Sequence, residues 1–306
     1  MSTKKVAIIL VNWNSYALTN DCIQSLKQTS SKDFDIIVVD NGSQDDSGLQ
    51  LKTAHPDIIL LSAGANLGFT GGNNLGMRYA IAQNYPYTFL LNNDTFVEPD
   101  FLDPLIQCMD TNIAIGAVQP RIFFHHNRNL IWNNGSYYSP FTGRTYTHSY
   151  QRTEPNPDMR PQQVDWITGC AFFIRTEILK QTGLFAENFF IYFEDVDLSF
   201  RIKKAGYALC YIPQSVIYHI AGESHKKPVK GKEGRLSAKV HYLHTRNNIW
   251  FLKKHTPIPY LPTVCLYNFF YLIGVMAYFV ARLRFQKLQA VWKGIRDGIN
   301  GHVQYN

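Results

Sequence analysis

Residues 35–43 read DIIVVDNGS, and residues 6–14 read VAIILVNWN. Each stretch contains a continuous run of apolar, mostly β-branched residues, which is typical of a strand buried on both faces. Polar residues follow each run, so each strand is predicted to end there. Between the two runs, residues 16–28 carry apolar side chains at a spacing of three and four, which predicts a helix. A strand–helix–strand unit of this kind indicates a parallel sheet.

The alternation of strands and helices continues along the chain and predicts a doubly wound α/β fold. Asn12, Asp40 and Asp94 each come just past the predicted end of a strand. Because ligands of open α/β sheets bind at that edge, we expect a ligand site there. Further predicted elements are helices over 47–54, 73–82, 100–109 and 194–205, strands over 58–62, 87–92, 115–119, 164–175, 209–212 and 216–219, a glycine-rich loop over 63–72 and an irregular excursion over 121–163.

Composition and charge bound the class of protein. The 306 residues are 45% apolar and 17% charged, which excludes a disordered or fibrous chain and suggests two domains. Residues 1–222 hold 16 Lys and Arg against 20 Asp and Glu, a net charge of −4, whereas residues 223–306 hold 14 against 3, a net charge of +11. We therefore expect a domain over 1–222 and a basic region over 223–306. Such a region suits nucleic acid, anionic lipid or phosphorylated substrates, but no nucleic-acid-binding signature accompanies it.

Residues 261–281 contain no charged residue and no histidine. As a helix they would extend about 32 Å, enough to cross an apolar bilayer core. Pro262 and Asn268 interrupt them, and a basic, weakly amphipathic helix is predicted over 288–299. We expect peripheral contact with a membrane, while a helix packed on the main domain is the alternative. Five cysteines without metal-type spacing, and an N-terminus without an export signal, suggest a cytoplasmic protein at the inner face of the cell membrane.

Five segments in a fixed order carry a family resemblance. They are VAIILVNWN (6–14), IIVVDNGSQDDS (36–47), NLGFTGGNN (66–74), FLLNNDTFVEPDFL (89–102) and TGCAFFIR…FFIYFEDVDLSFRIKKAGY (168–207). Over roughly residues 4–220 the chain resembles family 2 glycosyltransferases, nearest in pattern to bacterial rhamnosyltransferase-like members. The stretch HTRNNIWFLKKH (244–255) is also similar to C-terminal features of such enzymes. The resemblance implies a GT-A type Rossmann-like sandwich with a mostly parallel sheet, followed by a helical region.

The resemblance implies a nucleotide-sugar site at the sheet edge. Asp40 would read the base, since a carboxylate there can accept the imide N–H of uracil or thymine. The other residues implied in this site are Asn12, Asn14, Asn66, Gly72, Asn73 and Asn93. The same residue types also serve as helix caps and loop formers, so their sequence leaves a purely local role open.

Asn92, Asn93 and Asp94 stand where the family has its D-x-D motif. A divalent cation at this motif, Mg²⁺ or Mn²⁺, stabilises the diphosphate that leaves, and carboxylate oxygens hold such ions. Asn92 replaces the first aspartate, so Asp94 would be the main ligand. The resemblance also implies that His219 helps bind the metal or the diphosphate, although a lone histidine is more often a packing residue.

The acidic pair of Glu194 and Asp195 follows a run of aromatic residues. Apolar surroundings raise the pKa of a carboxyl group, which suits a general base. The resemblance implies that Asp195 is this base, with Glu194 as the second candidate; acids in a first helical turn also simply stabilise the helix. It further places Trp166, Thr168 and Gly169 beside the acceptor, although Trp166 suits a core position equally well.

These expectations describe an inverting glycosyltransferase in which Asp195 takes a proton from an acceptor hydroxyl. The expected donor is a dTDP- or UDP-linked sugar, with rhamnose suggested by the resemblance alone. The expected acceptor is a lipid-linked or cell-surface glycan. Asn92 leaves open a non-catalytic relative that binds nucleotide sugars or glycans. A nucleotidyltransferase is disfavoured, because residues 12–16 lack the glycine and the basic residue that its loop after the first strand would need.

Overall fold

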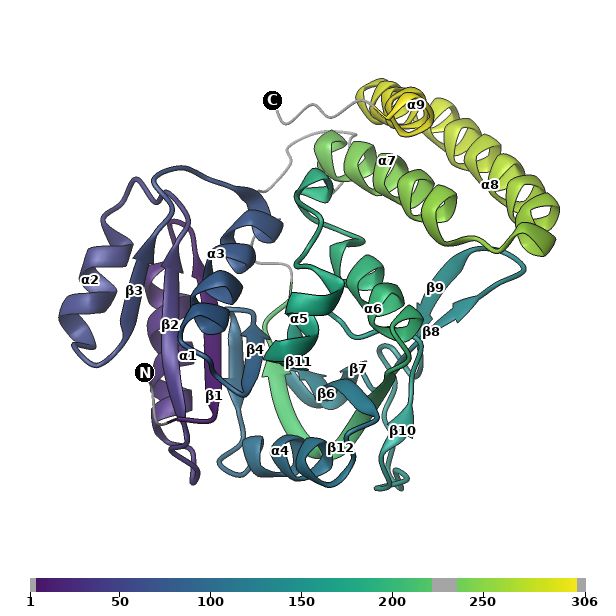
Figure 1. The fold of residues 1–306 in the computed structure, drawn as a ribbon. Helices are drawn as coiled ribbons and strands as arrows, with labels where there is room; N and C mark the ends of the chain where they lie inside the picture. The colour runs from purple at the N-terminus through teal and green to yellow at the C-terminus, as the bar shows by residue number, and fades with distance from the viewer. Residues whose placement is uncertain (1–3, 222–235, 302–306) are drawn as a thin grey trace. The chain divides into compact units, whose positions relative to one another are not determined.

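The computed structural model describes residues 4–221 and 236–301 (Figure 1). The strands are β1 (Val6–Asn12), β2 (Phe34–Asp40), β3 (Ile59–Ser62), β4 (Tyr87–Leu91), β5 (Thr95–Val97), β6 (Ile115–Phe124), β7 (Asn127–Asn133), β8 (Ser136–Ser139), β9 (Arg144–Thr147), β10 (Gln162–Gln163), β11 (Ala171–Arg175) and β12 (Ala208–His219). The helices are α1 (Tyr16–Lys27), α2 (Ser47–Ala54), α3 (Gly68–Ala82), α4 (Leu102–Thr111), α5 (Thr176–Thr182), α6 (Glu194–Lys204), α7 (Ala238–His255), α8 (Leu261–Ala281) and α9 (Phe285–Asn300), with 3₁₀ turns η1 (Glu187–Phe189) and η3 (Ile258–Tyr260).

The chain divides into two compact units. The first comprises residues 1–137, 147–190 and 194–221, and the second comprises residues 138–146, 191–193 and 222–306. The second unit therefore takes in two short segments from the N-terminal two thirds of the chain. One of them, 191–193, comes directly before helix α6 of the first unit.

The first unit is built on a mixed sheet with the strand order β10-β12-β6-β11-β4-β1-β2-β3. Neighbours among β4, β1, β2 and β3 are parallel, which confirms the predicted arrangement in this part. Strand β11 runs antiparallel to both β4 and β6 and joins them, while β12 is parallel to β6. Strand order reverses at β1, with β2 on one side and β4 on the other, which makes a topological switch point at the carboxyl ends of these strands.

The alternating side chains of β1 divide the core into two layers. Val6, Ile8 and Leu10 pack in the layer that contains α1, α2 and α4, whereas Ala7 and Ile9 pack in the layer that contains α3, α5 and α6. All five side chains are fully buried. A strand covered on both faces in this way must be apolar throughout, which explains the continuous apolar run in the sequence.

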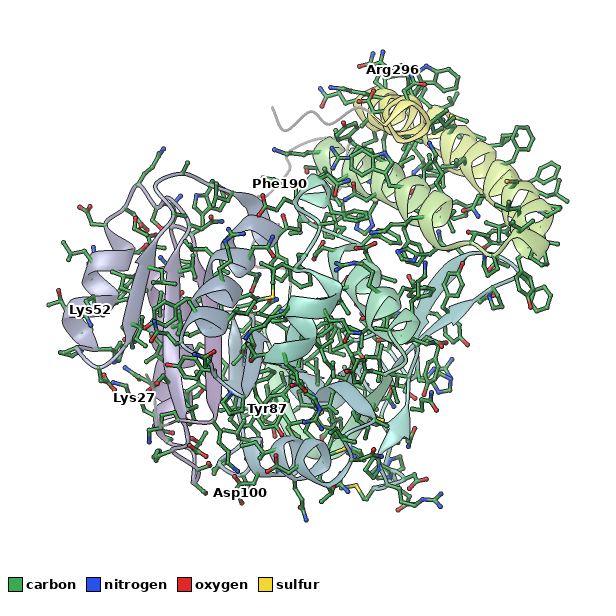
Figure 2. All side chains as sticks on the ribbon, viewed as in Figure 1. Lys27, Lys52, Tyr87, Asp100, Phe190 and Arg296 are labelled. Atoms are coloured by element: carbon green, nitrogen blue, oxygen red, sulfur yellow. The ribbon has the colours of Figure 1, made fainter. Side chains whose placement is uncertain are left out.

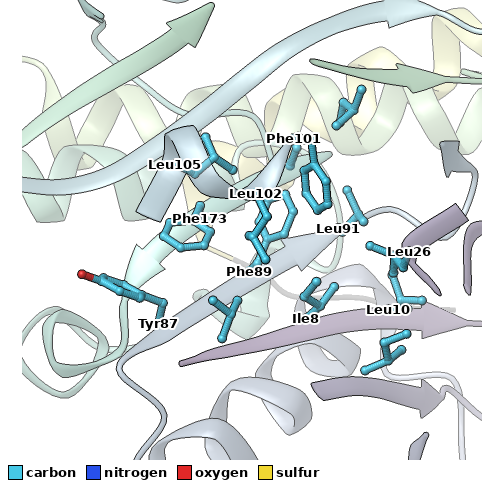
Figure 3. Packing of buried hydrophobic residues seen from close by; sticks show 14 of the residues in the cluster. Ile8, Leu10, Leu26, Tyr87, Phe89, Leu91, Phe101, Leu102, Leu105 and Phe173 are labelled. Carbon is cyan, nitrogen blue, oxygen red and sulfur yellow. The ribbon is translucent and has the colours of Figure 1, made fainter. Parts of the chain in front are cut away.

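Figure 3 shows part of the first layer, where aromatic rings fill the space between the sheet and α4. The ring of Phe89 lies with its centroid 5.6 Å from that of Phe173 and 6.0 Å from that of Phe101. Because each fully buried side chain of this size stabilises the fold by roughly 1.5–3 kcal/mol, this layer holds β4 and β11 firmly side by side. Of the candidate carboxylates described below, Asp94 follows β4 in the chain and Asp195 of α6 is hydrogen-bonded to Gly169, just before β11.

Several boundaries differ from the predictions: β6 extends to Phe124, and β7, β8, β9 and β10 lie in the predicted irregular excursion over 121–163. Helix α3 begins at Gly68, inside the predicted loop, and its glycines let it lie close on β1: a Cβ at Gly76 would come 2.5 Å from Cγ2 of Ile9. Strand β11 begins only at Ala171, because a turn interrupts the predicted strand over 164–175. In this turn the N–H of Ala171 donates to the carbonyl of Thr168. Residues 208–219 form one strand, β12, with an irregular register where two strands were predicted.

Helices α7, α8 and α9 make up most of the described part of the second unit (Figure 1). Helix α8 has the predicted bounds, and α9 begins at Phe285, somewhat before the predicted 288. Helix α7, which the sequence analysis did not predict, packs closely on α9. A Cβ at Gly294 would come 2.8 Å from the carbonyl oxygen of Tyr242, and the Tyr242 hydroxyl donates to Asp297 at 2.9 Å.

Candidate active site

The carboxyl ends of β1 and β2 bring Asp40 to the switch point. Asn12 and Asp40 are register partners at the last position of the two strands. The Oδ1 atom of Asp40 accepts the backbone N–H of Ser43 at 3.2 Å, which fixes the turn after β2. A Cβ at Gly48, in the first turn of α2, would lie 2.7 Å from Oδ2 of Asp40. The missing side chain at Gly48 therefore makes room for this carboxylate, a role that sequence reasoning did not find.

The structure gives the Asn12 amide protein partners in place of the predicted contact with a nucleotide. Asn12 is fully buried, and its Nδ2 donates to the hydroxyls of Ser43 at 3.2 Å and Ser47 at 2.8 Å. Its Oδ1 accepts the hydroxyl of Thr19 at 2.8 Å. With its hydrogen-bonding atoms taken by protein, Asn12 ties the loop after β2 to α1. The exposed Asn14 acts similarly, because its Oδ1 accepts the N–H of Gln44 at 2.7 Å.

The start of α3 is held by a second set of amides. Asn66 accepts the N–H of Gly68 at 2.8 Å, and its Oδ1 lies 3.3 Å from Nδ2 of Asn41. Asn41 is buried, also donates to the carbonyl of Gly68 at 3.1 Å and accepts the N–H of Leu67 at 3.0 Å. Asn41 thus links the turn after β2 to α3. The sequence showed it only as a turn residue.

Gly72 and Asn73 lie inside α3 rather than in an open loop. A Cβ at Gly72 would come 2.9 Å from Cγ1 of Val11, so this glycine allows close packing of α3 on β1. Asn73 is buried and donates to the carbonyl of Phe69 at 2.8 Å, one turn earlier in the helix. The predicted role of Gly72 and Asn73 in lining a nucleotide pocket therefore differs from the packing and hydrogen-bonding roles that the structure gives them. The helix period carries them inward, toward the sheet.

Asp94 and His219 meet because β5 pairs with β12. Thr95 lies opposite His219 in this antiparallel pair, and Oδ1 of Asp94 lies 3.1 Å from Nε2 of His219. Nδ2 of Asn92 lies 3.4 Å from the same nitrogen. Both Asp94 and His219 are buried, and the ring of Trp132 meets the imidazole edge-on at 4.6 Å. The structure thus joins the D-x-D-like segment to a histidine more than 120 residues away.

These two residues suit a divalent cation only in part. Two ligands at right angles around an octahedral ion, each at about 2.1 Å, lie roughly 3 Å apart, as Oδ1 of Asp94 and Nε2 of His219 do. Nδ1 of His219 is buried and has no hydrogen-bond partner within the described residues. No group of three His, Cys, Asp or Glu able to hold a metal occurs in residues 4–221 or 236–301. The remaining ligands would therefore have to come from substrate, as is common for Mg²⁺ bound with phosphates.

Asn93 points elsewhere in the same turn. Its Nδ2 donates to the hydroxyl of Thr19 at 2.7 Å, and this hydroxyl in turn donates to Asn12. Asn93 therefore continues the amide network that fastens α1 to the sheet edge. It is half-buried, unlike the fully buried Asn12.

Asp195 is held at the entry to β11, the neighbour of β4. The N–H of Asn92 donates to the carbonyl of Cys170 at 2.9 Å, which aligns the end of β4 with the start of β11. The N–H of Gly169 then donates to Oδ2 of Asp195 at 2.8 Å, and the N–H of Val196 donates to Oδ1 at 2.8 Å. The packing around Asp195 raises the pKa of its carboxyl group, against the opposing effect of these two N–H donors.

Cys170, directly before β11, is a buried thiol between the two candidate carboxylates in the backbone connections of β4 and β11. Burial raises the pKa of Cys170, and the charges of Asp94 and Asp195 raise it further. The carbonyl of Cys170 accepts the N–H of Asn92, two residues before Asp94, and the neighbouring Gly169 donates its N–H to Asp195. The structure therefore gathers Asp94 and Asp195 around the paired ends of β4 and β11.

The acidic cluster at the start of α6 separates into different environments. Glu194 is buried, its Oε2 has no hydrogen-bond partner in the described part of the chain, and burial together with the charge of Asp195 raises its pKa well above the ordinary range. Asp197 is buried in an ion pair with Arg201 at 2.9 Å. Arg201 also donates to the carbonyl of Leu184 at 2.7 Å, so this pair is structural.

Three bulky residues before Asp195 have backbone angles that side chains rarely adopt. The φ angles of Phe190, Tyr192 and Phe193 are +67°, +74° and +71°; Phe190 is labelled in Figure 2. Such residues persist only where surrounding structure holds them, and they cluster at functional sites. Within the second unit, Nδ2 of the buried Asn247 donates to the carbonyls of Ile191 and Tyr192, each at 2.9 Å. Asn247 was visible in the sequence only within the stretch at 244–255.

The three residues expected near the acceptor have different surroundings. Trp166 is half-buried and donates its indole N–H to the carbonyl of Tyr137 at 3.0 Å. Thr168 is buried, and its N–H donates to Oε1 of Gln119 at 3.3 Å. Of the three, Gly169 contacts a candidate catalytic carboxylate, and it does so through its backbone.

Comparison with known proteins gives this geometry a family context. The sequence profile described as glycosyl transferase family 2 matches residues 7–183, more than half of the chain. The N-acetylglucosaminyl-diphospho-decaprenol L-rhamnosyltransferase of Mycobacterium tuberculosis is 25% identical over 269 residues, which cover 81% of this chain and 87% of that protein. The low-salt glycan biosynthesis hexosyltransferase of Haloferax volcanii is 28% identical over 248 residues, which cover 79% of this chain and 73% of that protein.

Solved structures share the fold. A mannosyltransferase from Pyrobaculum calidifontis, in complex with GDP-Man and Mn²⁺, superposes with a TM-score of 0.57 at 13% identity over 98% of this chain and 88% of that one. GalNAc-T7 with UDP, GalNAc and Mn²⁺ superposes with a TM-score of 0.58 at 14% identity over 90% of this chain and 57% of that one. At these identities the likeness concerns the fold alone, and it confirms the predicted GT-A architecture.

Proposed function

Since this chain belongs to glycosyl transferase family 2, we propose that it transfers a sugar from a dTDP- or UDP-linked donor to a hydroxyl group of a lipid-linked or cell-surface glycan. Enzymes of this family invert the configuration of the transferred sugar. The observation that carries the proposal is the convergence of Asp94 and Asp195 on the paired ends of β4 and β11. One carboxylate is thereby available for the leaving group and another for the acceptor.

Asp195 acts as the general base in this proposal. Its two backbone N–H donors hold the carboxylate in one orientation, and the raised pKa strengthens it as a proton acceptor. The acceptor hydroxyl loses its proton to Asp195 as its oxygen bonds to the anomeric carbon. The bond between that carbon and the diphosphate oxygen breaks in the same displacement, and the electron pair leaves with the nucleoside diphosphate.

Asp94 and His219 are proposed to hold Mg²⁺ or Mn²⁺ together with the donor diphosphate. When bound there, the ion supplies positive charge that stabilises the leaving diphosphate. The 3.1 Å separation of the two side chains supports this role, and the lack of a third protein ligand in the described residues predicts weak metal binding without nucleotide. Asn92, in place of a carboxylate, contributes an amide beside His219.

Asp40 is proposed to accept the imide N–H of uracil or thymine. Its position at the switch point and the space left by Gly48 support this. Rhamnose as the sugar, and a diphosphate-linked lipid as the acceptor carrier, are supported by the mycobacterial relative, whose name states both.

A non-catalytic relative that binds nucleotide sugars or glycans is the second candidate. Asn92 in the D-x-D-like segment favours it, because this substitution removes one carboxylate ligand. The two candidates differ in turnover, so activity must be measured alongside binding.

A thermal-shift screen tests the donor site first. The ligands are UDP, dTDP, GDP, ADP and CDP, each with and without Mn²⁺, on the wild type and on Asp40→Ala and Asp94→Ala. Ligands that bind the native state raise the unfolding midpoint by mass action. We expect UDP or dTDP to stabilise the wild type in the presence of metal, and neither variant to respond. Asp45→Ala is the matched control, because Asp45 is an exposed carboxylate of the same loop and should respond like wild type.

Turnover of the corresponding nucleotide sugars then tests the base. Asp195→Asn should keep the thermal shift and lower kcat by about 10²–10⁴-fold, the usual contribution of general base catalysis. A folded wild type that responds to no nucleotide would contradict the donor site. Metal-dependent binding without turnover of any dTDP- or UDP-sugar would favour the non-catalytic candidate.

A further inference from the structure

Helix α8 exposes an apolar surface that a water-soluble helix rarely has. Among the described residues, 258–281 form the one helical segment that is long and apolar enough to cross a membrane. Within it an 18-residue window has a mean hydropathy of 1.8, and only 11% of that window is buried. Phe269 and Phe270 are 60% and 61% exposed. Contiguous exposure on this scale marks an interaction surface rather than scattered surface residues.

The buried residues of α8 form one narrow stripe. Val264, Asn268 and Phe279 are its buried positions. Within the second unit the Phe279 ring meets His241 of α7 at 5.0 Å, and Oδ1 of Asn268 accepts Nδ2 of Asn248 at 3.4 Å. This stripe attaches α8 to α7 through Asn268, near the middle of the helix, and Phe279, near its C-terminal end.

The opposite side of α8 defines what we call the outward face. Its residues are Leu266, Phe270, Ile273 and Val280, which follow one another at helical spacing and are 42–61% exposed. Leu266 is two residues from the buried Val264, a rotation of about 200° around the helix. The outward face is therefore apolar along nearly the full length of α8.

Polar groups contact α8 near its middle and argue against a membrane crossing. Nδ2 of Asn268 donates to the carbonyl of Thr142 at 2.9 Å, and the guanidinium of Arg144 lies 4.4 Å from the ring centroid of Tyr271. Both partners belong to the segment 138–146 of the second unit. If α8 crossed a bilayer, Arg144 and the Thr142 backbone would lie in the hydrocarbon, where charged and irregular chain is costly.

The charge of the helical region matches an anionic surface. Residues 236–301 hold nine Lys and Arg against one Asp, a net charge of +8, and all of these cations except Arg246 and Lys287 are at least partly exposed. Arg282 and Arg284 follow α8 directly, and Lys293 and Arg296 are exposed on α9. Arg296 is labelled in Figure 2. Each basic residue close to a membrane containing anionic lipid is attracted to it, and several together act cooperatively with apolar contact.

We propose that α8 lies in the plane of an anionic lipid bilayer, with its outward face inserted at the boundary of headgroups and acyl chains and its stripe still packed on α7. This is monotopic binding at the inner face of the cell membrane, without a crossing. The proposal rests on contacts inside the second unit and does not depend on the donor site. A second copy of this chain on the same face is the competing occupant, which the experiment distinguishes.

Vesicle flotation of the full-length protein tests the lipid partner. The vesicles contain phosphatidylcholine alone, or with about a third of phosphatidylglycerol as the anionic lipid. Ile273→Glu places a charge on the outward face, and Ile113→Glu is the matched control, since Ile113 is 79% exposed in the first unit. We expect wild type and Ile113→Glu to float with the anionic vesicles and Ile273→Glu to bind at least about tenfold more weakly. Equal flotation of both variants, or flotation of neither wild type nor control, would overturn the proposal.

The depth of three labels tests the orientation. Leu266→Cys, Ile273→Cys and Val280→Cys, each with the exposed Cys265 changed to Ser, carry a fluorophore on one face over roughly 21 Å of helix. Quenching by lipids brominated at different depths should give one shallow depth, about 5–10 Å, for all three labels. A central label deeper than the other two, or labels reached from opposite sides of the vesicle, would mean a crossing. Protection of all three labels by concentration-dependent dimerisation without lipid would assign the face to a second copy.

Discussion

The space beside Asp40 makes Gly48→Ala an informative substitution. In an ordinary helix this change stabilises a protein by roughly 0.5–1 kcal/mol, because alanine has the better helix propensity. Here the new Cβ would lie 2.7 Å from Cγ and Oδ2 of Asp40 and 2.8 Å from its Cβ. Crowding of this kind costs about 1–3 kcal/mol, so we expect Gly48→Ala to lower the free energy of unfolding by about 1–2 kcal/mol.

The larger effect should appear in nucleotide binding. Gly48→Ala must displace the Asp40 carboxylate, and a hydrogen bond to a charged group contributes about 1.5–3 kcal/mol. That loss corresponds to a rise of roughly 10- to 150-fold in the Kd of UDP or dTDP. Titration calorimetry with Mn²⁺ present measures the Kd, and urea unfolding measures the stability of the same samples. Asp40→Ala provides the reference value for complete loss of the carboxylate.

Gly274→Ala is the matched control. Gly274 is also a helical glycine, in α8, and a Cβ there would have no neighbour within 4 Å among the described residues. We expect it to raise stability by roughly 0.5–1 kcal/mol and to leave the nucleotide Kd unchanged. The reasoning is refuted if Gly48→Ala binds nucleotide like wild type while Asp40→Ala does not. It is also refuted if Gly48→Ala is as stabilising as the control.

Two further substitutions test the surroundings of Asp195. The native-state pKa of Glu194 is raised, so its ionisation opposes folding as the pH rises above the ordinary glutamate range. In urea unfolding, Glu194→Gln should match the stability of wild type near pH 4 and become the more stable protein towards pH 8. A stability difference that is constant with pH would contradict this. Asn247→Ala removes the donor for the carbonyls of residues 191–192 and should lower the free energy of unfolding by about 1–3 kcal/mol. It should also lower kcat more than the control Asn248→Ala, which removes only a long hydrogen bond of 3.4 Å. Equal kcat for both variants would mean that the Asn247 contact does not position Asp195.

The local sequence pattern was sufficient to predict elements whose burial or exposure is uniform along their length, such as β2 and α8. The run of β-branched residues ending at Asp40 predicted β2 because a strand covered on both faces admits no polar side chain. Helix α8 was predicted with its observed bounds, 261–281, because a mostly apolar segment of that length without a charged residue has few other stable conformations. Neither prediction needed knowledge of a distant partner.

Pattern failed where tertiary packing overrides local preference. Gly68, Gly71 and Gly72 indicate a loop by propensity, but α3 begins there because small residues let it pack directly on β1. Arg201 lies one helical turn from Asp197, but only the fold buries this pair and brings the carbonyl of Leu184 to its guanidinium. Asn12 looked like a ligand-binding amide, and only the fold fills its hydrogen bonds with Ser47 and Thr19.

The sequence by itself determined the alternation of strands and helices from β1 to the start of β6, the family, and which side chains carry charge at the strand ends. The tertiary structure alone decided which of these side chains meet. Asp94 reaches His219 only through the register of β5 on β12, and Asp195 reaches the end of β4 only through the pairing of β11 with that strand. The physical reason is that periodicity is set by neighbours in the chain, whereas these contacts depend on strand pairing between residues far apart in sequence.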